Sequence, residues 1–398
     1  MTLAPYGAPL VEDDDIQAVV DVLKSGWLTT GPMVDEFEHA LFKHCAAQEA
    51  VACNSGTAAL HLAYQALGIG EGDIVIVPAQ TFAATANAAR FLGAEIQFCD
   101  VDPKTGLMTT ETLEKAISCY PDTSRIRAVS IVHLNGQLAD MLTLSEICRR
   151  NGWAVVEDAC HALGGVYDNG SPVGSCSHSD MTVFSFHAVK TITAGEGGAV
   201  TTNNTQLATR MRTMRSHGIT RNSGDFEDND QALSPDGKVN PWYYEMQHLG
   251  WNYRLSDIGC ALALSQLKKL PRFVETRATL RQRYKDGLQS LAPVCTPVPN
   301  LSIGTPAWHL FAAKIDFDRL GKSRASVMKS LREKGIGSQV HYIPLHRQPY
   351  YRKRYGVADL PGADTYYKQV LSLPLHAGMR IEDVDRICEA LKAILLGP

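Results

Sequence analysis

The sequence predicts an α/β fold, with a large domain built on a mostly parallel β-sheet and a smaller C-terminal α/β domain. The first observation is that short apolar segments alternate with helical patterns between residues 49 and 202. Strands that alternate with helices form mostly parallel sheets that are covered on both faces. The second observation is length, because 398 residues that are 45% hydrophobic suffice for a large core with a smaller domain beside it.

The elements of the large domain follow from the spacing of apolar residues along the chain. Gly26 ends the first helix. The expected helices are 12–25, 33–44, 54–67, 85–92, 109–118 and 143–151. The expected strands are 49–53, 74–77, 95–98, 128–133, 154–157, 181–184 and 199–202. Ligands of such sheets bind beyond the carboxyl ends of the strands, which is where Ser55, Phe82, Asp158 and Ser185 fall.

The second half of the chain contains an irregular segment and then the second domain. Residues 221–247 are polar and acidic with little periodicity, which predicts a long surface excursion. A helix is expected at 255–270, and Pro271 marks the expected boundary between a large domain, 1–271, and a small domain, 272–398. The small domain has expected strands at 309–315 and 337–340 and expected helices at 324–334 and 381–396.

Composition excludes several classes of protein. A formal net charge of −4 and a pI near 6.4 give no electrostatic reason to expect nucleic acid or an anionic membrane as a partner. The sequence has no run of eighteen apolar residues and its N-terminus lacks the pattern of a signal peptide, so we expect a cytoplasmic location. The ten cysteines show no Cys-x-x-Cys pairing, which favours buried reduced thiols over a metal site or disulfides.

Lys190 is the first candidate for chemistry. It follows an apolar strand, has small and apolar neighbours, and has no acidic residue within five positions. Burial disfavours the charged form of a lysine and lowers its pKa, which makes a free amine available for a Schiff base with an aldehyde. The alternative is a lysine that extends from a strand end to solvent.

Residues 54–57, Asn-Ser-Gly-Thr, open a helix and resemble an anion site. Gly56 permits close approach of the backbone, Thr57 supplies a hydroxyl, and the free amides of a helix N-terminus attract negative charge. The alternative is that Asn54 or Ser55 merely caps the helix.

Asp158, Ser185 and Phe82 complete a set suited to pyridoxal phosphate. Asp158 ends a strand, and a carboxylate paired with the pyridine nitrogen keeps that nitrogen protonated. Ser185 lies five residues before Lys190, where a hydroxyl can reach a phosphate, and Phe82 can lie against a ring. Taken singly, Asp158 could cap a turn and Phe82 could be core packing.

These motifs together resemble one known family over essentially the whole chain. The sequence is similar to the DegT/DnrJ/EryC1/StrS family of nucleotide-sugar aminotransferases in five segments: Asn-Ser-Gly-Thr at 54–57, Glu-Asp-Ala-Cys-His-Ala at 157–162, Ser-Phe-His-Ala-Val-Lys at 185–190, Gly-Glu-Gly-Gly at 195–198 and Gly-Trp-Asn-Tyr-Arg-Leu-Ser-Asp at 250–257. Segments 242–247, 264–269 and 339–344 resemble the branch of this family that acts in pseudaminic acid biosynthesis.

The resemblance implies a type I aminotransferase fold, pyridoxal 5′-phosphate as cofactor, and a homodimer whose two sites lie at the subunit interface. Lys190 is expected to bind the cofactor aldehyde and to move the proton. The expected cofactor contacts are Asp158 at the ring nitrogen, Phe82 on the ring, His161 near the ring hydroxyl, Gly56, Thr57 and Ser185 at the phosphate, and Asn252 at the phosphate of the partner's site.

The expected substrate residues are Tyr6, His187, Arg254, His341 and Tyr342, with the 221–247 excursion as a candidate cover. Arg254 has the alternative of pairing with Asp257 along one helix face. Three positions depart from the common family pattern: His161 stands where many relatives have glutamine, and Ala188 and Thr191 flank the lysine motif.

The function implied is transfer of an amino group from L-glutamate to the 4-keto group of a nucleotide-linked sugar. The expected acceptor is UDP-2-acetamido-2,6-dideoxy-β-L-arabino-hex-4-ulose, in pseudaminic acid or related surface-glycan biosynthesis. The alternatives are a dTDP- or GDP-linked or C3-specific substrate, or a regulator that binds the cofactor without turnover. Some relatives that act as dehydratases have histidine at the lysine position, so Lys190 favours amino transfer.

Overall fold

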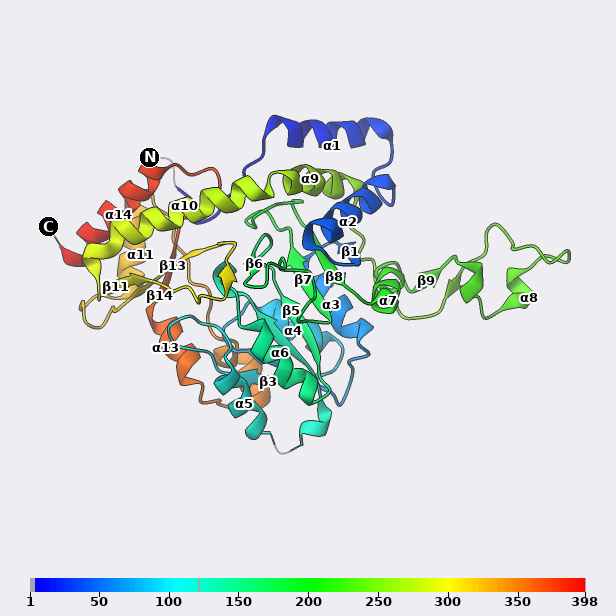
Figure 1. Ribbon diagram of the computed structural model, residues 1–398, viewed down its shortest axis with the longest axis horizontal. Helices are drawn as coiled ribbons and strands as arrows, with labels where there is room; N and C mark the ends of the chain where they lie inside the picture. The colour runs from blue at the N-terminus through cyan, green and yellow to red at the C-terminus, as the bar shows by residue number, and fades with distance from the viewer. Residues whose placement is uncertain (1–3, 121, 398) are drawn as a thin grey trace.

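The computed structural model describes residues 4–120 and 122–397, and its large domain is organised around a seven-stranded sheet (Figure 1). The strand order is β1-β8-β7-β5-β4-β2-β3, and β8 runs antiparallel to both of its neighbours while the remaining pairs are parallel. The prediction of a mostly parallel sheet is therefore confirmed. The strands are β1 Glu49–Cys53, β2 Ile74–Pro78, β3 Glu95–Cys99, β4 Ile126–Val132, β5 Ala154–Asp158, β7 Met181–Ser185 and β8 Gly198–Thr202.

Helices cover both faces of this sheet because both faces are apolar. One buried cluster joins the sheet to α2, α5, α6 and α9, and a second joins its other face to α3, α4 and α7. The helices are α1 Asp13–Ser25, α2 Pro32–Cys45, α3 Gly56–Ala66, α4 Ala83–Phe91, α5 Thr110–Ser118, α6 Met141–Arg150, α7 Thr205–Arg215 and α9 Asp257–Lys268. The sequence pattern predicted all of these except α7, with ends that differ by a few residues.

The C-terminal part folds around a three-stranded antiparallel sheet in the order β11-β13-β14. Its strands are β11 Cys295–Pro297, β13 Phe311–Ile315 and β14 Val370–Leu373. Its helices are α10 Leu270–Leu288, α11 Arg324–Glu333, α12 Pro349–Tyr355, α13 Pro361–Gln369 and α14 Ile381–Leu396. Helix α10 joins the two parts, because Phe273 packs in the core of the large sheet and Tyr284 in the core of the small one. Pro271 lies in the first turn of α10, and the domain boundary there stays a prediction.

One local expectation is wrong, and a second, that of buried cysteines, holds for eight of ten positions. Residues 337–340 do not form a strand: only Gln339 bridges to Ser372, while the Gly337 amide donates to the Ala4 carbonyl at 2.7 Å. The N-terminal arm thus occupies the hydrogen-bonding groups that a neighbouring strand would have used, and residues 1–3 of that arm lie outside the described residues.

The cysteines are all free and eight are buried, but Cys119 is exposed. Within the described residues, no helix is long and apolar enough to cross a membrane.

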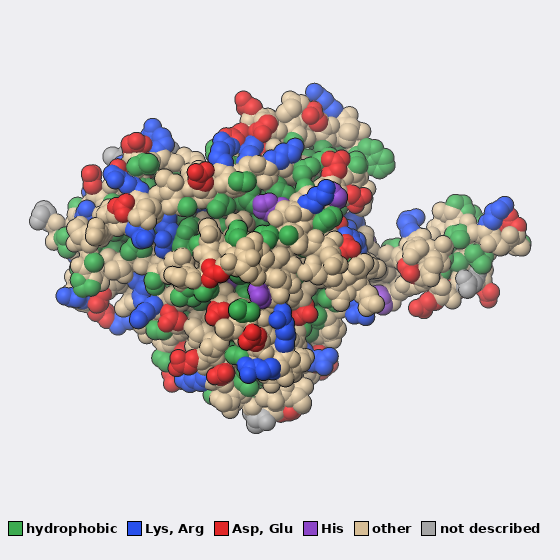
Figure 2. Space-filling model, in the orientation of Figure 1, with side chains coloured by type: hydrophobic (Ala, Val, Ile, Leu, Met, Phe, Trp, Pro, Cys, Tyr) green, Lys and Arg blue, Asp and Glu red, His purple; other side chains and the backbone are tan. Residues whose placement is uncertain are grey.

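The excursion expected at 221–247 projects from the body of the molecule (Figure 1). Its base is a short antiparallel pair of β9 Ile219–Thr220 and β10 Glu245–Met246, and it contains α8 Asn229–Ala232. Hydrophobic side chains lie on its surface in Figure 2, and Trp242 and Met246 are 71% and 65% exposed. At its base, the Gly218 carbonyl accepts from the Gln247 amide at 2.9 Å.

A buried carboxylate on β5 links this strand to neighbouring segments. Glu157 is 1% exposed, and its carboxylate accepts hydrogen bonds from His133 Nε2 at 2.9 Å, Thr182 Oγ1 at 2.8 Å and Ser179 Oγ at 2.9 Å, and from the Tyr167 hydroxyl. Burial alone raises the pKa of Glu157, but these donors, led by His133, reverse the change and the net pKa is lowered.

We expect Glu157→Ala to lower the free energy of unfolding by about 3 kcal/mol, because it leaves several buried donors without an acceptor. The lowered pKa means that the contribution of Glu157 is complete above the carboxyl's unfolded value and is lost as the pH falls through its folded value. Urea unfolding at a series of pH values measures both effects. Asp385→Ala, which removes an exposed partner of Arg283, is the control and should change stability much less. Equal losses for the two variants would contradict the structural role of Glu157.

Candidate active site

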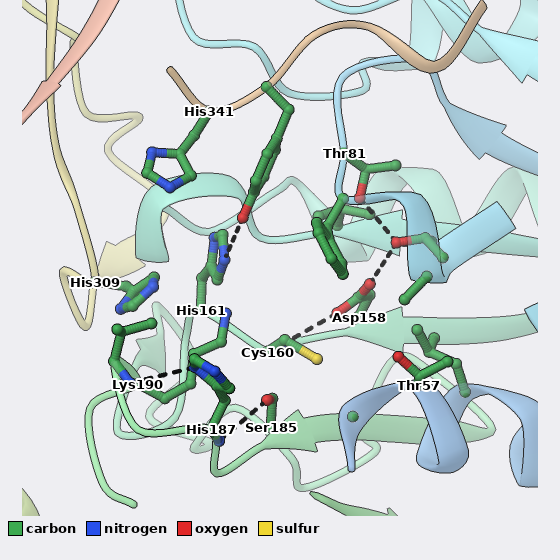
Figure 3. Close-up of a pocket in the computed structure, with 18 of the residues that line it drawn as sticks. Thr57, Thr81, Asp158, Cys160, His161, Ser185, His187, Lys190, His309 and His341 are labelled. Carbon is green, nitrogen blue, oxygen red and sulfur yellow. Dashed lines mark hydrogen bonds between the residues drawn. The ribbon is translucent and has the colours of Figure 1, made fainter. Parts of the chain in front are cut away.

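A cavity of about 340 Å³ opens at the carboxyl ends of the parallel strands. Strands β5 and β7 end at it with Asp158 and Ser185, and helices α3 and α4 begin at its edge (Figure 3). Polar and aromatic side chains dominate its lining: Tyr6, Ser55, Gly56, Thr57, Thr81, Phe82, Thr85, Asp158, Cys160, His161, Ser185, His187, Lys190, Glu196, His309, His341 and Tyr342. The cavity therefore lies where ligands bind in sheets of this class.

Lys190 lies in the loop that follows β7. The backbone of this loop is fixed, because the Phe186 amide donates to the Gly197 carbonyl at 2.8 Å and the Lys190 amide donates to the His187 carbonyl at 2.9 Å. Burial lowers the pKa of Lys190, and the nearby acidic groups of Cys160 and Asp158 offset only part of this effect. The structure therefore supplies an amine that loses its proton more readily than a surface lysine, as the sequence predicted.

Asp158 is oriented by two hydrogen bonds. Its Oδ2 accepts from Thr85 Oγ1 at 2.8 Å, and its Oδ1 accepts from the Cys160 amide at 3.2 Å. Thr85 is itself linked to Thr81 at 2.8 Å between their hydroxyl oxygens. The carboxylate is 6% exposed and lines the cavity, so it is held in one orientation next to the space where a ring nitrogen would be bound.

The N-terminus of α3 forms a close-fitting cradle with the end of β7. A Cβ atom built at Gly56 would lie 2.9 Å from Ser185 Cβ, so only glycine allows this approach. Ser55 caps the helix by accepting from the Ala58 amide at 3.1 Å, which confirms the capping alternative without removing the cradle. Thr57, Ser185 and the free amides of the helix N-terminus face the cavity together, a donor set that fits a phosphate.

The ring of Phe82 is exposed in the wall of the cavity. It lies at the start of α4, is 58% exposed, and has its ring centroid 5.7 Å from that of Tyr342. Core packing, the alternative left open by the sequence, is therefore wrong for Phe82. An exposed aromatic ring in the wall of a cavity fits contact with the face of a heterocycle.

Three histidines, His161, His309 and His341, line one wall of the cavity, and the last two come from the C-terminal part of the chain. His161 and His309 have ring centroids 4.4 Å apart, and His341 Nδ1 lies 2.8 Å from Ser372 Oγ. Burial lowers the pKa of His161 and His309 well below the usual range, and burial together with the charge of Lys190 lowers the pKa of His341 to about 3. These rings are therefore neutral near pH 7, and they act through hydrogen bonds rather than charge.

The structure brings together most of the residues expected at the site. Eleven of them line the cavity: Tyr6, Gly56, Thr57, Phe82, Asp158, His161, Ser185, His187, Lys190, His341 and Tyr342. Sequence reasoning missed Thr85 and His309, although Thr85 lies three residues after Phe82, in the segment that follows the predicted strand 74–77.

Asn252 and Arg254 are not among the residues that line the cavity of their own chain. Asn252 is exposed and bridges to Ser216, and Arg254 Nη1 donates to Ser216 Oγ at 3.1 Å. The alternative pairing of Arg254 with Asp257 is wrong, because the Asp257 carboxylate accepts from the amides of Gly31 and Met33 at 2.7 and 3.1 Å. Neither Asn252 nor Arg254 therefore contributes to the cavity of its own chain.

Comparison with known proteins places this arrangement in a family. Residues 9–392 match the DegT/DnrJ/EryC1/StrS aminotransferase family. The chain is 38% identical to the spore coat polysaccharide biosynthesis protein SpsC of Bacillus subtilis (strain 168) over 396 residues, which cover 99% of this chain and 97% of that protein.

Solved structures show the same fold. Helicobacter pylori PseC, an aminotransferase involved in the biosynthesis of pseudoaminic acid, matches 100% of both chains with a TM-score of 0.89 and 29% identity. The PLP form of Spr1654 from Streptococcus pneumoniae matches 99% of both chains with a TM-score of 0.87 and 28% identity, and its PMP form is equally similar.

Aminotransferases of this family use pyridoxal phosphate, and the cavity offers the groups this cofactor needs: a partly buried lysine with a lowered pKa, an oriented carboxylate, an exposed aromatic ring and an anion cradle. Each group lies at the end of a strand or the start of a helix, where the fold fixes its position. The chain belongs to the DegT/DnrJ/EryC1/StrS aminotransferase family and is a pyridoxal phosphate-dependent transaminase.

Proposed function

We propose that this chain transfers an amino group from L-glutamate to the C4 keto group of a nucleotide-linked sugar, in the cytoplasm. The observation that carries the proposal is the union of Lys190, Asp158 and the α3 cradle in one cavity. The sugar class is supported by SpsC and PseC, because both are described as acting in the biosynthesis of a polysaccharide or a sugar acid.

The residues of this chain divide the work of the reaction. Bound pyridoxal phosphate supplies an electron sink for the carbon that loses its proton. Lys190 would hold the cofactor through its aldehyde, and its amine, once free, would take the proton from the α-carbon of glutamate and deliver a proton to C4 of the sugar. Asp158, oriented by Thr85, would keep the proton on the ring nitrogen.

Other cavity residues bind and orient. Gly56, Thr57 and Ser185, which line one end of the cavity, would hold the phosphate, and Phe82 would lie against the ring. We assign contact with the sugar and its diphosphate to Tyr6, His187 and His341, and to Arg254 of a second copy of the chain. Hydroxyl groups and diphosphates are recognised by hydrogen-bond donors and cations of these types.

The acceptor that we favour is UDP-2-acetamido-2,6-dideoxy-β-L-arabino-hex-4-ulose, from the resemblance of segments 242–247, 264–269 and 339–344 to pseudaminic acid transaminases. A panel of UDP-, GDP- and dTDP-linked 4-keto-6-deoxy sugars, incubated with holoenzyme and L-glutamate, tests it. Mass spectrometry should detect replacement of the keto oxygen by an amine in the UDP sugar first.

The panel also separates the alternatives. Preference for a dTDP- or GDP-linked sugar would replace the favoured acceptor and retain the reaction, and so would amination of a 3-keto sugar added to the same assay. Binding of pyridoxal phosphate without amination of any keto sugar would favour the alternative, a regulator that binds the cofactor without turnover. Omission of glutamate, with other amino acids in its place, identifies the donor in the same assay.

We further propose that the working unit is a homodimer in which Asn252 completes the phosphate site of the partner subunit. The support is that Asn252 is exposed and away from the cavity of its own chain, while the family resemblance assigns it to the phosphate. Burial of a site at such an interface makes cofactor retention depend on the dimer.

Subunit complementation tests this arrangement. Lys190→Ala and Asn252→Ala should each be impaired alone, and mixed dimers of the two should recover part of the activity, because one of their two sites then has both natural residues. If Asn252 serves its own subunit, every site in the mixture is defective and no activity returns. Light scattering on the same samples shows whether dimers are present, and a fully active monomer would remove the dimer from the proposal.

A further inference from the structure

Asn135, His161 and Tyr342 form a chain of hydrogen bonds along one wall of the cavity. The backbone amide of Asn135 donates to His161 Nδ1 at 3.3 Å, and His161 Nε2 lies 3.1 Å from the Tyr342 hydroxyl oxygen. The dashed line that leaves His161 in Figure 3 marks the second of these bonds. The three residues come from the short turn after β4, the loop after β5 and the C-terminal part of the chain.

The first bond determines the direction of the second. An amide N–H can only donate, so His161 Nδ1 is an acceptor and carries no hydrogen. The hydrogen of the neutral ring is then on Nε2, which donates to the Tyr342 oxygen. We propose that this chain of hydrogen bonds turns the Tyr342 hydroxyl into a donor toward the cavity, where it binds an acceptor oxygen of the sugar or of the cofactor ring.

Asn135 is held firmly in the geometry that this role requires. Its backbone is in the left-handed region, with φ 64° and ψ −1°, a conformation that asparagine adopts more readily than most residues. Its side-chain Nδ2 donates to the Tyr366 hydroxyl at 3.0 Å, and its carbonyl accepts from the His309 amide at 2.9 Å. Asn135 is therefore a positioning residue, which acts on the ligand only through His161 and Tyr342.

Among the described residues, His161 is the only hydrogen-bond partner of the Tyr342 hydroxyl. The Gln80 side chain donates to the Tyr342 carbonyl at 3.0 Å and so fixes its backbone. Both ring nitrogens of His161 are engaged by protein atoms, so His161 has no N–H left for a ligand. The sequence resemblance assigns contact with the ring hydroxyl to His161. In this scheme Tyr342 makes that contact instead.

The identity of the acceptor oxygen depends on the proposed function, but the direction of the hydrogen bonds does not. Nitrogen-15 NMR of histidine-labelled holoenzyme measures the tautomer directly, and loss of one signal in His161→Gln assigns it among the 13 histidines. We expect His161 to be protonated on Nε2 only and unchanged from about pH 6 to 8, a range in which an ordinary histidine titrates. Protonation on Nδ1, or on both nitrogens, would overturn the proposal whatever the enzyme does.

Tyr342→Phe tests the donor itself and distinguishes the two sources of the acceptor. Loss of one hydrogen bond should weaken binding about threefold to tenfold. A sugar acceptor predicts a higher KM for the keto sugar with unchanged cofactor affinity, and a cofactor acceptor predicts weaker binding of pyridoxal phosphate with a shifted absorption band. Combination with His161→Gln should add little, because both act through one chain of bonds.

Tyr351→Phe is the matched control, since it removes a tyrosine hydroxyl that donates to Asn87 Oδ1 at 2.7 Å outside the cavity. We expect it to leave the KM for the sugar and the affinity for pyridoxal phosphate unchanged. A Tyr342→Phe enzyme that matches this control in both measurements would overturn the proposed donor. If no keto sugar is aminated, the tautomer and the cofactor affinity still decide the inference, so its failure is distinct from failure of the proposed function.

Discussion

Replacement of Lys190 by alanine is expected to lower the rate of amino transfer at least about 1,000-fold. The variant loses both the amine that binds the cofactor and the group that moves the proton, and the second loss alone is worth this much in enzymes that rely on general acid and base catalysis. The fold should be unaffected, because the loop is fixed by backbone hydrogen bonds such as that from the Phe186 amide to Gly197. Steady-state kinetics on protein with an unchanged circular dichroism spectrum measures the effect.

Borohydride reduction and peptide mapping test the same residue without turnover. The reduced adduct should be found on Lys190 alone, and Lys190→Ala should yield none. Lys314 is the matched control, because burial also lowers its pKa but it donates to the Pro103 carbonyl outside the cavity. Lys314→Ala should keep both the adduct and the activity. An adduct on a lysine other than Lys190 would contradict the assignment.

Asp158→Asn is expected to lower the turnover rate about 100-fold or more while leaving the Lys190 adduct in place. An amide cannot keep the ring nitrogen protonated as a carboxylate does, and a hydrogen bond to a charged group is worth about 1.5–3 kcal/mol. The change therefore acts on the proton transfer and less on binding. Absorbance titration with pyridoxal phosphate and kinetics with the keto sugar separate the two quantities.

Thr85→Val provides a graded comparison for Asp158. It removes the 2.8 Å bond to Asp158 Oδ2 but keeps the carboxylate and nearly the same side-chain volume. We expect a loss of about tenfold, smaller than that of Asp158→Asn, because the charge remains and only its orientation is relaxed. Equal activities of wild type and Asp158→Asn would show that this carboxylate does not serve the ring nitrogen.

The local pattern of the sequence was sufficient for most of the elements that support the site. The strands that end at Asp158 and Ser185, and the helix that begins beside Gly56, follow from spacings of two and 3.6 residues. Segment 337–340 shows the limit of such patterns. It resembles a strand, but the N-terminal arm, more than 300 residues away along the chain, takes the Gly337 amide.

Family motifs also named most of the residues that line the cavity, because each motif falls at the end of a strand or the start of a helix. They could not name Thr85 as the partner of Asp158, 73 positions away, nor decide that Asp257 binds Gly31 and Met33 rather than Arg254. A side chain selects its partner by distance and direction, and neither is encoded in local spacing when the partners lie far apart in sequence.

The sequence by itself therefore determined the fold class and the family, and it named Lys190, Asp158 and Ser185 as the residues that we propose to carry the chemistry. These depend on patterns within a few residues and on motifs that are contiguous in the chain. Only the tertiary structure decided the orientation of the Asp158 carboxylate, and the direction in which His161 donates. Both are set by hydrogen bonds to Thr85 and Asn135, whose positions are fixed by the packing of distant segments around one cavity.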